Sequence, residues 1–223
     1  VGTIRGHVYS LDAKTGCVYW AIKNPTGVRS ALSIERLPNS DPPKYVAYFG
    51  DLSATMHAVE AQTGKTLWET KVETHPISRI TGSPKFHDGR LYVPVTSLEE
   101  ASAADPTYPC CTFRGNLVAL DAATGKQIWK TYTILEEPKP TRKNKKGVQQ
   151  YGPAGATIWS SPTIDPEGGR IYVTTGDNYA DPATTTSDAI IAFDLKTGKF
   201  LWSEQFLAND AWNVACDSAN EEN

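Results

Sequence analysis

The chain has 223 residues, with 22 Lys or Arg and 25 Asp or Glu, and therefore a formal net charge of −3 at pH 7. This balance argues against general nucleic-acid binding, which relies on a strongly basic surface. No apolar run of the sequence approaches the roughly 20 residues of a membrane-spanning helix.

One nine-residue pattern, Asp/Glu-x-x-Thr-Gly-x-x-x-Trp, occurs four times, at residues 12–20, 60–68, 121–129 and 194–202. The acidic side chain and the Thr can bond nearby backbone, and Gly accepts a positive φ, so the Asp-x-x-Thr-Gly part predicts a turn. Short alternating runs on both sides predict that each turn joins the two strands of a β-hairpin. A fixed repeat of this kind indicates a repeat architecture.

Two further strands are readable before two of these hairpins. Ser83-Pro84 begins one innermost strand and residues 89–93 continue as the next strand, and Ser161-Pro162 with residues 169–173 repeats the arrangement. Four short strands per unit form the blade of a β-propeller. The sequence therefore predicts an all-β fold, a β-propeller of four-stranded antiparallel blades.

The acidic positions of the motif are 48, 61 and 73 residues apart, whereas a bare blade needs about 40–45 residues. The excess predicts inserted loops at residues 96–112 and 134–154, and long loops on a rigid scaffold often carry function. We interpret residues 1–223 as one partial propeller domain of about three full and two partial blades, because a closed ring needs roughly four to eight blades.

Trp159 and a pair of adjacent cysteines stand outside the repeat, and each has two readings. Trp159 starts an innermost strand, so it either stacks on a planar cofactor in the central channel or simply fills that channel. Cys110 and Cys111 form either a vicinal disulfide, which persists in an oxidising compartment, or two buried thiols. None of the four cysteines forms a C-x-x-C pair, so a zinc knuckle or a c-type haem site is not expected within these residues.

Oxygen-bearing side chains follow two equivalent strands. Glu99 and Glu100 follow one strand, and Asp177 and Asn178 follow its counterpart one blade later. Such oxygens are the ligands that Ca²⁺ takes, although exposed acidic loops have the same composition. The basic stretch 139–146 either steers an acidic redox partner or is a solvated insertion loop.

The repeat Ala-x-Asp-x-x-Thr-Gly-Lys-x-x-Trp resembles the tryptophan-docking motif of quinoprotein dehydrogenases that use pyrroloquinoline quinone (PQQ). The resemblance covers essentially the whole chain and implies an eight-bladed ring in which each Trp docks onto the neighbouring repeat. A non-enzymatic relative, the outer-membrane assembly lipoprotein of Gram-negative bacteria, has a similar repeat. The alternative is therefore a non-catalytic propeller scaffold that binds proteins.

The same resemblance implies which residues contact the quinone. Trp159 corresponds to the family Trp that forms the floor under PQQ, and a vicinal disulfide covers the opposite face in that family. The disulfide here lies in a different blade from that of the best-known members. A basic side chain at the start of an innermost strand also suits the three carboxylates of the cofactor. The implied cofactor-binding residues are Thr157, Trp159, Thr81, Arg79, Cys110, Cys111 and Arg114.

The resemblance also implies the metal ligands and the catalytic base. The family binds its calcium with a Glu and an Asn, which correspond to Glu99 and Asp177, and the implied metal residues are Glu99, Glu100, Asp177 and Asn178. The family pattern His-Asp-x-Trp-Asp reads Asn-Asp-Ala-Trp-Asn here, so Asn213 replaces the proposed base. Asp210, Glu99 or a water molecule then serves as the base, while Asn213 positions groups.

The resemblance implies an enzyme that oxidises alcohols by hydride transfer to Ca²⁺-bound PQQ and passes electrons to a cytochrome c. Residues 97–106, the Cys-Cys-Thr-Phe-Arg-Gly run and residues 175–179 resemble polyvinyl-alcohol dehydrogenases, which act on secondary alcohols of a polymer. Some members carry haem c in a separate domain, which would lie outside these residues. A periplasmic or secreted bacterial location is implied as well.

Overall fold

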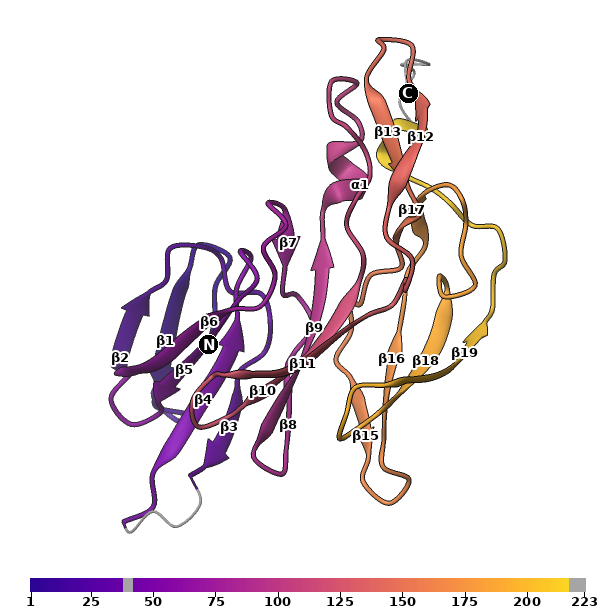
Figure 1. The fold of residues 1–223 in the computed structure, drawn as a ribbon. Helices are drawn as coiled ribbons and strands as arrows, with labels where there is room; N and C mark the ends of the chain where they lie inside the picture. The colour runs from indigo at the N-terminus through magenta and orange to yellow at the C-terminus, as the bar shows by residue number, and fades with distance from the viewer. Residues whose placement is uncertain (38–41, 217–223) are drawn as a thin grey trace.

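The computed structural model describes residues 1–37 and 42–216 of the chain. Nearly all its regular structure is antiparallel β-sheet, as Figure 1 shows. The N-terminal sheet pairs β1 (His7–Leu11) with β2 (Val18–Lys23). In the described part, no helix is both long and apolar enough to cross a membrane.

Three larger sheets have the strand order of propeller blades. The first blade contains β3 (Ser33–Arg36), β4 (Tyr45–Gly50), β5 (Thr55–Glu60) and β6 (Thr66–Lys71). The second blade contains β7 (Ser78–Arg79), β8 (Lys85–His87), β9 (Arg90–Ser97), β10 (Asn116–Asp121) and β11 (Gln127–Tyr132), with β7 and β8 both paired to β9. The third blade contains β15 (Thr163–Asp165), β16 (Arg170–Thr174), β18 (Ala189–Asp194) and β19 (Phe200–Gln205). The predicted four-stranded antiparallel blades are confirmed.

The turn predicted within each motif forms as expected. In the second blade, Asp121 Oδ1 accepts hydrogen bonds from Thr124 N at 2.9 Å and from Thr124 Oγ1 at 2.6 Å. Asp12 and Asp194 make the same pair of bonds to the Thr of their own copies. Gly125 follows with a φ of 72°, a left-handed conformation that Gly adopts at little cost.

Each of the first three motif Trp residues packs on the Gly of the next copy along the chain. A Cβ built on Gly125 would lie 2.5 Å from a ring carbon of Trp68, so only glycine permits this contact. Trp20 packs on Gly64 and Trp129 packs on Gly198 in the same way. At these junctions the indole ring of one blade therefore packs directly on the backbone of the Gly-containing turn of the next blade.

The hydrophobic core lies between the blades. Tyr48 of the first blade packs with Val93 and Leu120 of the second blade. Leu117 of the second blade packs with Phe193 of the third blade in a separate cluster. Fully burying one such side chain contributes about 1.5–3 kcal/mol, so packing between blades supplies much of the stability.

The predicted insertions lie outside the blades. The first continues from β9 into a one-turn helix, α1 (Glu99–Ser102), and then into the segment with the two cysteines. The second forms a hairpin of β12 (Lys139–Lys143) and β13 (Gln149–Gly152), followed by β14 (Ala154–Gly155), which pairs with β17 (Asn178–Ala180). A short 3₁₀ helix, η1 (Val214–Cys216), ends the described residues. In Figure 1, α1, β12, β13 and β17 gather at the top, and the β8–β9 and β15–β16 turns lie at the bottom.

Candidate functional site

Most of the predicted site residues lie on three segments that backbone hydrogen bonds hold side by side. We name them the disulfide segment (110–115), the Trp159 segment (155–161) and the acidic segment (176–179). The bonds are Gly155 N to Phe113 O (2.8 Å), Gly115 N to Gly155 O (2.9 Å), Ala156 N to Asp177 O (2.8 Å) and Gly176 N to Thr157 O (3.1 Å). These four bonds bring the disulfide, Trp159 and the predicted metal ligands Asp177 and Asn178 into one region.

Trp159 is half-buried and lies against Gly176, whose added Cβ would be 3.8 Å from the indole. The Trp159 segment also touches the inner edge of the second blade. Ser161 Oγ donates to Ser83 O at 2.7 Å, and a Cβ on Gly82 would lie 2.5 Å from Ser160 O. Thr81, which precedes Gly82, therefore belongs to the inner segment adjacent to that of Trp159. The innermost strands themselves begin slightly later than predicted, at Lys85 and Thr163.

Three predicted site residues have buried polar atoms without any hydrogen-bond partner in the described part of the protein. They are Arg79 Nε, Thr81 Oγ1 and Asp177 Oδ2. Leaving a buried donor or acceptor unsatisfied costs about 1–3 kcal/mol, so native proteins rarely do so without a reason. The Thr81 hydroxyl and one Asp177 oxygen are thus available to a ligand on the segments that adjoin that of Trp159, and Arg79 Nε is available two residues before Thr81.

The predicted vicinal disulfide is confirmed, because the sulfur atoms of Cys110 and Cys111 are bonded to each other. Both cysteines are buried and pack with Tyr179 and Ala154. Cys111 Sγ lies 3.8 Å from Tyr179 O. The disulfide therefore rests on the strand that continues from the acidic segment.

Glu99 is fully buried, and both of its carboxylate oxygens accept hydrogen bonds from the disulfide segment and its flank. Oε1 accepts from Thr112 N at 2.8 Å and from Tyr108 Oη at 3.0 Å, and Oε2 accepts from Phe113 N at 2.7 Å. His75 Nε2 lies 3.6 Å from Oε1. The structure therefore places Glu99 as an anchor for the residues on either side of the disulfide.

Asp177 has a different environment, in which negative charge accumulates. Burial, together with the charges of Glu100, Asp188 and Asp210, raises the pKa of Asp177 to about 6. Burial also raises the pKa of Glu100, and a hydrogen bond from Tyr179 partly opposes that shift. No group of three or more His, Cys, Asp or Glu side chains in residues 1–37 and 42–216 is already spaced to hold a metal ion.

The two predicted asparagines bind backbone. Asn178 Nδ2 donates to Ala154 O at 3.0 Å, and its Oδ1 accepts from Thr184 N at 2.7 Å. Asn213 Nδ2 donates to Tyr179 O at 2.8 Å, and its Oδ1 accepts from Ala215 N at 3.0 Å. Both side chains fix the backbone around Tyr179 in these positions.

Tyr179 received no role from the sequence, yet it connects several predicted residues. Its hydroxyl lies 3.0 Å from Thr157 Oγ1, and both side chains are fully buried. Burial raises the pKa of this phenol, which therefore stays protonated at neutral pH. The only available signal was its position directly after Asp177-Asn178, and that position alone specifies no contact.

Arg114 is engaged elsewhere. Its guanidinium carbon lies 4.0 Å from the centre of the Tyr132 ring, and Nη1 is 3.3 Å from the carbonyl oxygens of Ile134, Leu135 and Glu136. Nη2 lies 3.8 Å from Glu137 Oε1. The structure thus directs the Arg114 guanidinium to the loop after β11.

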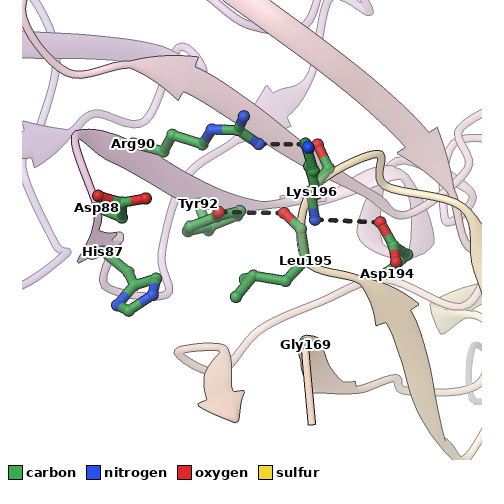
Figure 2. Close-up of a pocket in the computed structure, with 8 residues that line it drawn as sticks. All are labelled: His87, Asp88, Arg90, Tyr92, Gly169, Asp194, Leu195 and Lys196. Carbon is green, nitrogen blue, oxygen red and sulfur yellow. Dashed lines mark hydrogen bonds between the residues drawn. The ribbon is translucent and has the colours of Figure 1, made fainter. Parts of the chain in front are cut away.

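A cavity of about 360 Å³ lies at the other end of the blades and is lined by none of the predicted residues. Figure 2 shows Arg90 and Tyr92 of the second blade reaching the turn of the third blade. Arg90 Nη1 donates to Lys196 O at 2.8 Å, and Tyr92 Oη donates to Leu195 O at 3.1 Å. These bonds indicate a junction between blades.

Comparisons with known proteins agree with this geometry. The family described as "Glucose/ethanol/alcohol dehydrogenase, beta-propeller domain" matches residues 98–220, and that described as "Outer membrane protein assembly factor BamB" matches residues 1–143. The chain is 45% identical over 219 residues to a polyvinylalcohol dehydrogenase of Pseudomonas sp, covering 98% of this chain and 34% of the relative. It is 46% identical over 211 residues to the enzyme of that name from Sphingopyxis sp. (strain 113P3), covering 95% and 32%. The chain thus spans about a third of the length of these relatives.

Solved structures with low sequence identity share the fold. The quinohemoprotein alcohol dehydrogenase of Comamonas testosteroni superposes with a TM-score of 0.68 at 22% identity, covering 93% of this chain and 33% of that one. A europium-containing methanol dehydrogenase gives a TM-score of 0.67 at 20% identity, covering 96% and 40%. These similarities confirm the propeller fold. Since the dehydrogenase match covers more than half of the chain and includes Trp159, the disulfide and the acidic segment, the chain belongs to the β-propeller family of glucose, ethanol and alcohol dehydrogenases.

Proposed function

We propose that the protein oxidises alcohols with PQQ bound beside Trp159, and that residues 1–223 form part of one propeller ring. The observation that carries this proposal is the pair of unpartnered buried atoms Thr81 Oγ1 and Asp177 Oδ2 on the segments that flank Trp159, together with Arg79 Nε on β7, two residues before Thr81. Such atoms also occur elsewhere, for example Trp129 Nε1, but a propeller that only binds proteins on its surface has no need to place them on the inner segments next to Trp159. The family of the chain and the names of its relatives support the same activity.

The residues present fit a planar, multiply charged cofactor. The Trp159 indole offers an apolar floor, and the Arg79 cation suits a carboxylate of the quinone. The Thr81 hydroxyl has no partner among residues 1–37 and 42–216, whereas the Thr157 hydroxyl bonds Tyr179. Cys110 and Cys111 form the opposite wall. Bound PQQ supplies the electrophilic carbon that accepts hydride.

A hard cation is proposed beside the same wall. Of the four predicted ligands, Glu99 and Asn178 have their oxygen atoms in hydrogen bonds, while Asp177 keeps an unpartnered oxygen. Glu100 acts electrostatically on Asp177, and both have a raised pKa. We therefore favour Asp177 and Glu100 as ligands, since a Ca²⁺ ion offsets the repulsion between them.

Asp210 is the proposed base. Its side chain makes no hydrogen bond to a described residue, and its negative charge contributes to the raised pKa of Asp177. Asn213 carries no ionisable group and is already bonded to Tyr179 O. In this role Asp210 takes the hydroxyl proton of the alcohol while hydride leaves the carbon, which leaves a carbonyl product.

The finer assignments rest on the relatives. Their names support a secondary or polymeric alcohol as substrate, and the term quinohemoprotein supports a cytochrome c acceptor, with haem c in a separate domain. A periplasmic or secreted location agrees with the disulfide. The match of residues 1–143 to an assembly factor favours a protein-binding scaffold as the second candidate.

The test uses the complete natural polypeptide that carries these residues. We expect 2-propanol and polyvinyl alcohol to reduce an artificial electron acceptor only when PQQ and Ca²⁺ are both present. Asp210→Asn is expected to lower kcat by about 10²-fold or more, without changing the quenching of Trp fluorescence by PQQ. Trp159→Ala removes that quenching, while Trp212→Ala serves as the control. Absence of both activity and quenching in the unmodified protein supports the scaffold.

A further inference from the structure

A second cavity, of about 370 Å³, lies on the outer side of the vicinal disulfide. Cys110, Tyr179 and Asn213 form its inner wall, and the β12–β13 hairpin contributes Arg142, Gln150 and neighbouring residues to its outer wall. This volume falls within the roughly 300–1,000 Å³ of small-molecule sites in proteins. Cys110 and Asn213 already have roles in the site described above, whereas none of those roles uses Arg142, Gln150 or Asp181.

The hairpin is held in a fixed position against the disulfide. Tyr151 N donates to Cys110 O at 2.7 Å, and Cys111 N donates to Tyr151 O at 3.0 Å, so β13 pairs with the disulfide segment. The tip is tied as well, since Asn144 Nδ2 donates to Pro106 O at 2.8 Å. The outer wall is thus part of the same framework as the site.

This cavity is lined by both hydrogen-bond donors and hydrogen-bond acceptors. The Arg142 guanidinium makes no hydrogen bond or ion pair to another residue in the described part, so its donors are available. Asp181 lines the same cavity and provides acceptors. A hydroxyl both donates and accepts, so it matches such a pair, whereas an anion would be repelled by Asp181. Ala180 and Ala211 add apolar surface between the polar groups.

We propose that this cavity binds the part of a hydroxylated chain that lies beyond the reacting carbon, with Arg142 and Gln150 as hydrogen-bonding residues. The ligand class is a polyol with alternating methylene and hydroxyl groups, as in polyvinyl alcohol. The cavity is then a subsite that separates polymeric or difunctional alcohols from simple ones. This inference rests on the proposed alcohol oxidation for its substrate.

The test compares Arg142→Ala and Gln150→Ala with Lys143→Ala in the complete holoenzyme. Lys143 is the next residue on the same exposed strand and does not line the cavity. We expect Arg142→Ala to raise KM about tenfold for 2,4-pentanediol and polyvinyl alcohol, because a hydrogen bond to a charged group is lost. With 2-propanol, which has no second hydroxyl, KM and kcat stay within twofold. Lys143→Ala leaves all three substrates unchanged.

A direct binding measurement separates this inference from the proposed function. Titration calorimetry with a polyvinyl alcohol oligomer, without electron acceptor, is expected to show binding that Arg142→Ala weakens about tenfold and Lys143→Ala does not. If the protein oxidises none of the alcohols but binds the oligomer in this way, the proposed function fails and the subsite stands. Equal KM changes for 2-propanol and the polymer, or equal binding by the Arg142 and Lys143 variants, overturn the subsite.

Discussion

Asp51 and Asp177 are buried carboxylates whose pKa values move in opposite directions. Burial alone would raise the pKa of Asp51, but hydrogen bonds from His57, Asn24 and backbone amides outweigh burial and lower it. At Asp177, burial is reinforced by neighbouring carboxylates, and one oxygen has no partner. The first arrangement stabilises the protein, and the second is typical of sites that bind a ligand.

The contribution of Asp51 to stability depends on pH. Its folded-state pKa lies below the unfolded value of about 4, so the stabilisation is complete above that value and is lost as the pH falls toward the folded-state pKa. We expect Asp51→Asn to lower the free energy of unfolding by about 3 kcal/mol at pH 7, because an amide keeps only one of the two acceptor oxygens and carries no charge, so either His57 and Asn24 or Ser53 and Thr55 lose their buried acceptor. Urea denaturation at pH 7, 5 and 3 measures this difference.

The difference between Asp51→Asn and the unmodified protein shrinks toward pH 3. Asp88→Asn is the control, because Asp88 is exposed, and it should change the stability by less than about 0.5 kcal/mol at every pH. If Asp51→Asn lowers the free energy of unfolding equally at pH 3 and pH 7, ionisation of Asp51 contributes nothing to stability.

At the level of single residues, the sequence identified chemical types better than their partners. Trp159 and the cysteine pair stand out because they break a repeat, and the structure places them on adjoining segments. The resemblance matched the family calcium ligand to Glu99 rather than Glu100, but it did not predict which of the two side chains is buried, since side chains of consecutive helical residues point about 100° apart. Tyr179 could not be assigned because its contacts come from residues distant in sequence.

At the level of elements, α1 and the disulfide segment behave as a unit. The helix begins directly after β9, and its first residue, Glu99, accepts hydrogen bonds from Tyr108 before the disulfide and from Thr112 and Phe113 after it. The carboxylate therefore connects a one-turn helix to both flanks of the loop. Bonds to a charged acceptor of this kind are worth about 1.5–3 kcal/mol each.

Glu99→Gln should loosen this loop without disturbing the blades. An amide has a single acceptor oxygen, so one of the two backbone N–H groups at Thr112 and Phe113 loses its partner. We expect hydrogen exchange of these two amides to become about tenfold faster or more, while exchange of Val118 in β10 stays the same. Hydrogen exchange followed by NMR or mass spectrometry reports this change.

Glu100→Gln is the matched control for Glu99→Gln, because its side chain is half-buried and does not bond the disulfide segment. It should leave exchange at Thr112 and Phe113 unchanged. Equal exchange rates in the two variants would show that Glu99 does not anchor the loop.

Elements with local causes were predictable, and those with distant causes were not. The Asp-x-x-Thr-Gly turn forms through bonds within five residues, so the motif was sufficient to predict each hairpin. The β12–β13 hairpin was expected only as an insertion, because Lys139–Lys143 is exposed throughout and has no apolar alternation. Its strand β13 is fixed by pairing with Cys110 and Cys111, a contact that no local pattern shows.

At the scale of the whole molecule, the blades are joined by repeated contacts that are not all equivalent. Trp20 Nε1 donates to Ala61 O at 3.0 Å, and Trp68 Nε1 donates to Ala122 O at 3.1 Å. Trp129 packs on Gly198 in the same manner, but its buried Nε1 has no partner in the described part of the chain. Tyr92 Oη donates to the carbonyl of Leu195, the position equivalent to Ala61 and Ala122, just as Tyr48 Oη donates to Ala122 O at 3.0 Å. A repeat in sequence thus predicts the packing but not each hydrogen bond.

This difference predicts unequal effects of the same substitution at two docking positions. Trp68→Phe removes ring surface and a hydrogen bond and leaves Ala122 O with one donor fewer. Trp129→Phe removes similar surface, since both rings are half-buried, but also eliminates an unpaired buried N–H. We expect Trp68→Phe to lower the free energy of unfolding by about 1 kcal/mol more than Trp129→Phe. Urea denaturation of the two variants measures the difference, and equal losses would mean that ring packing alone couples the blades.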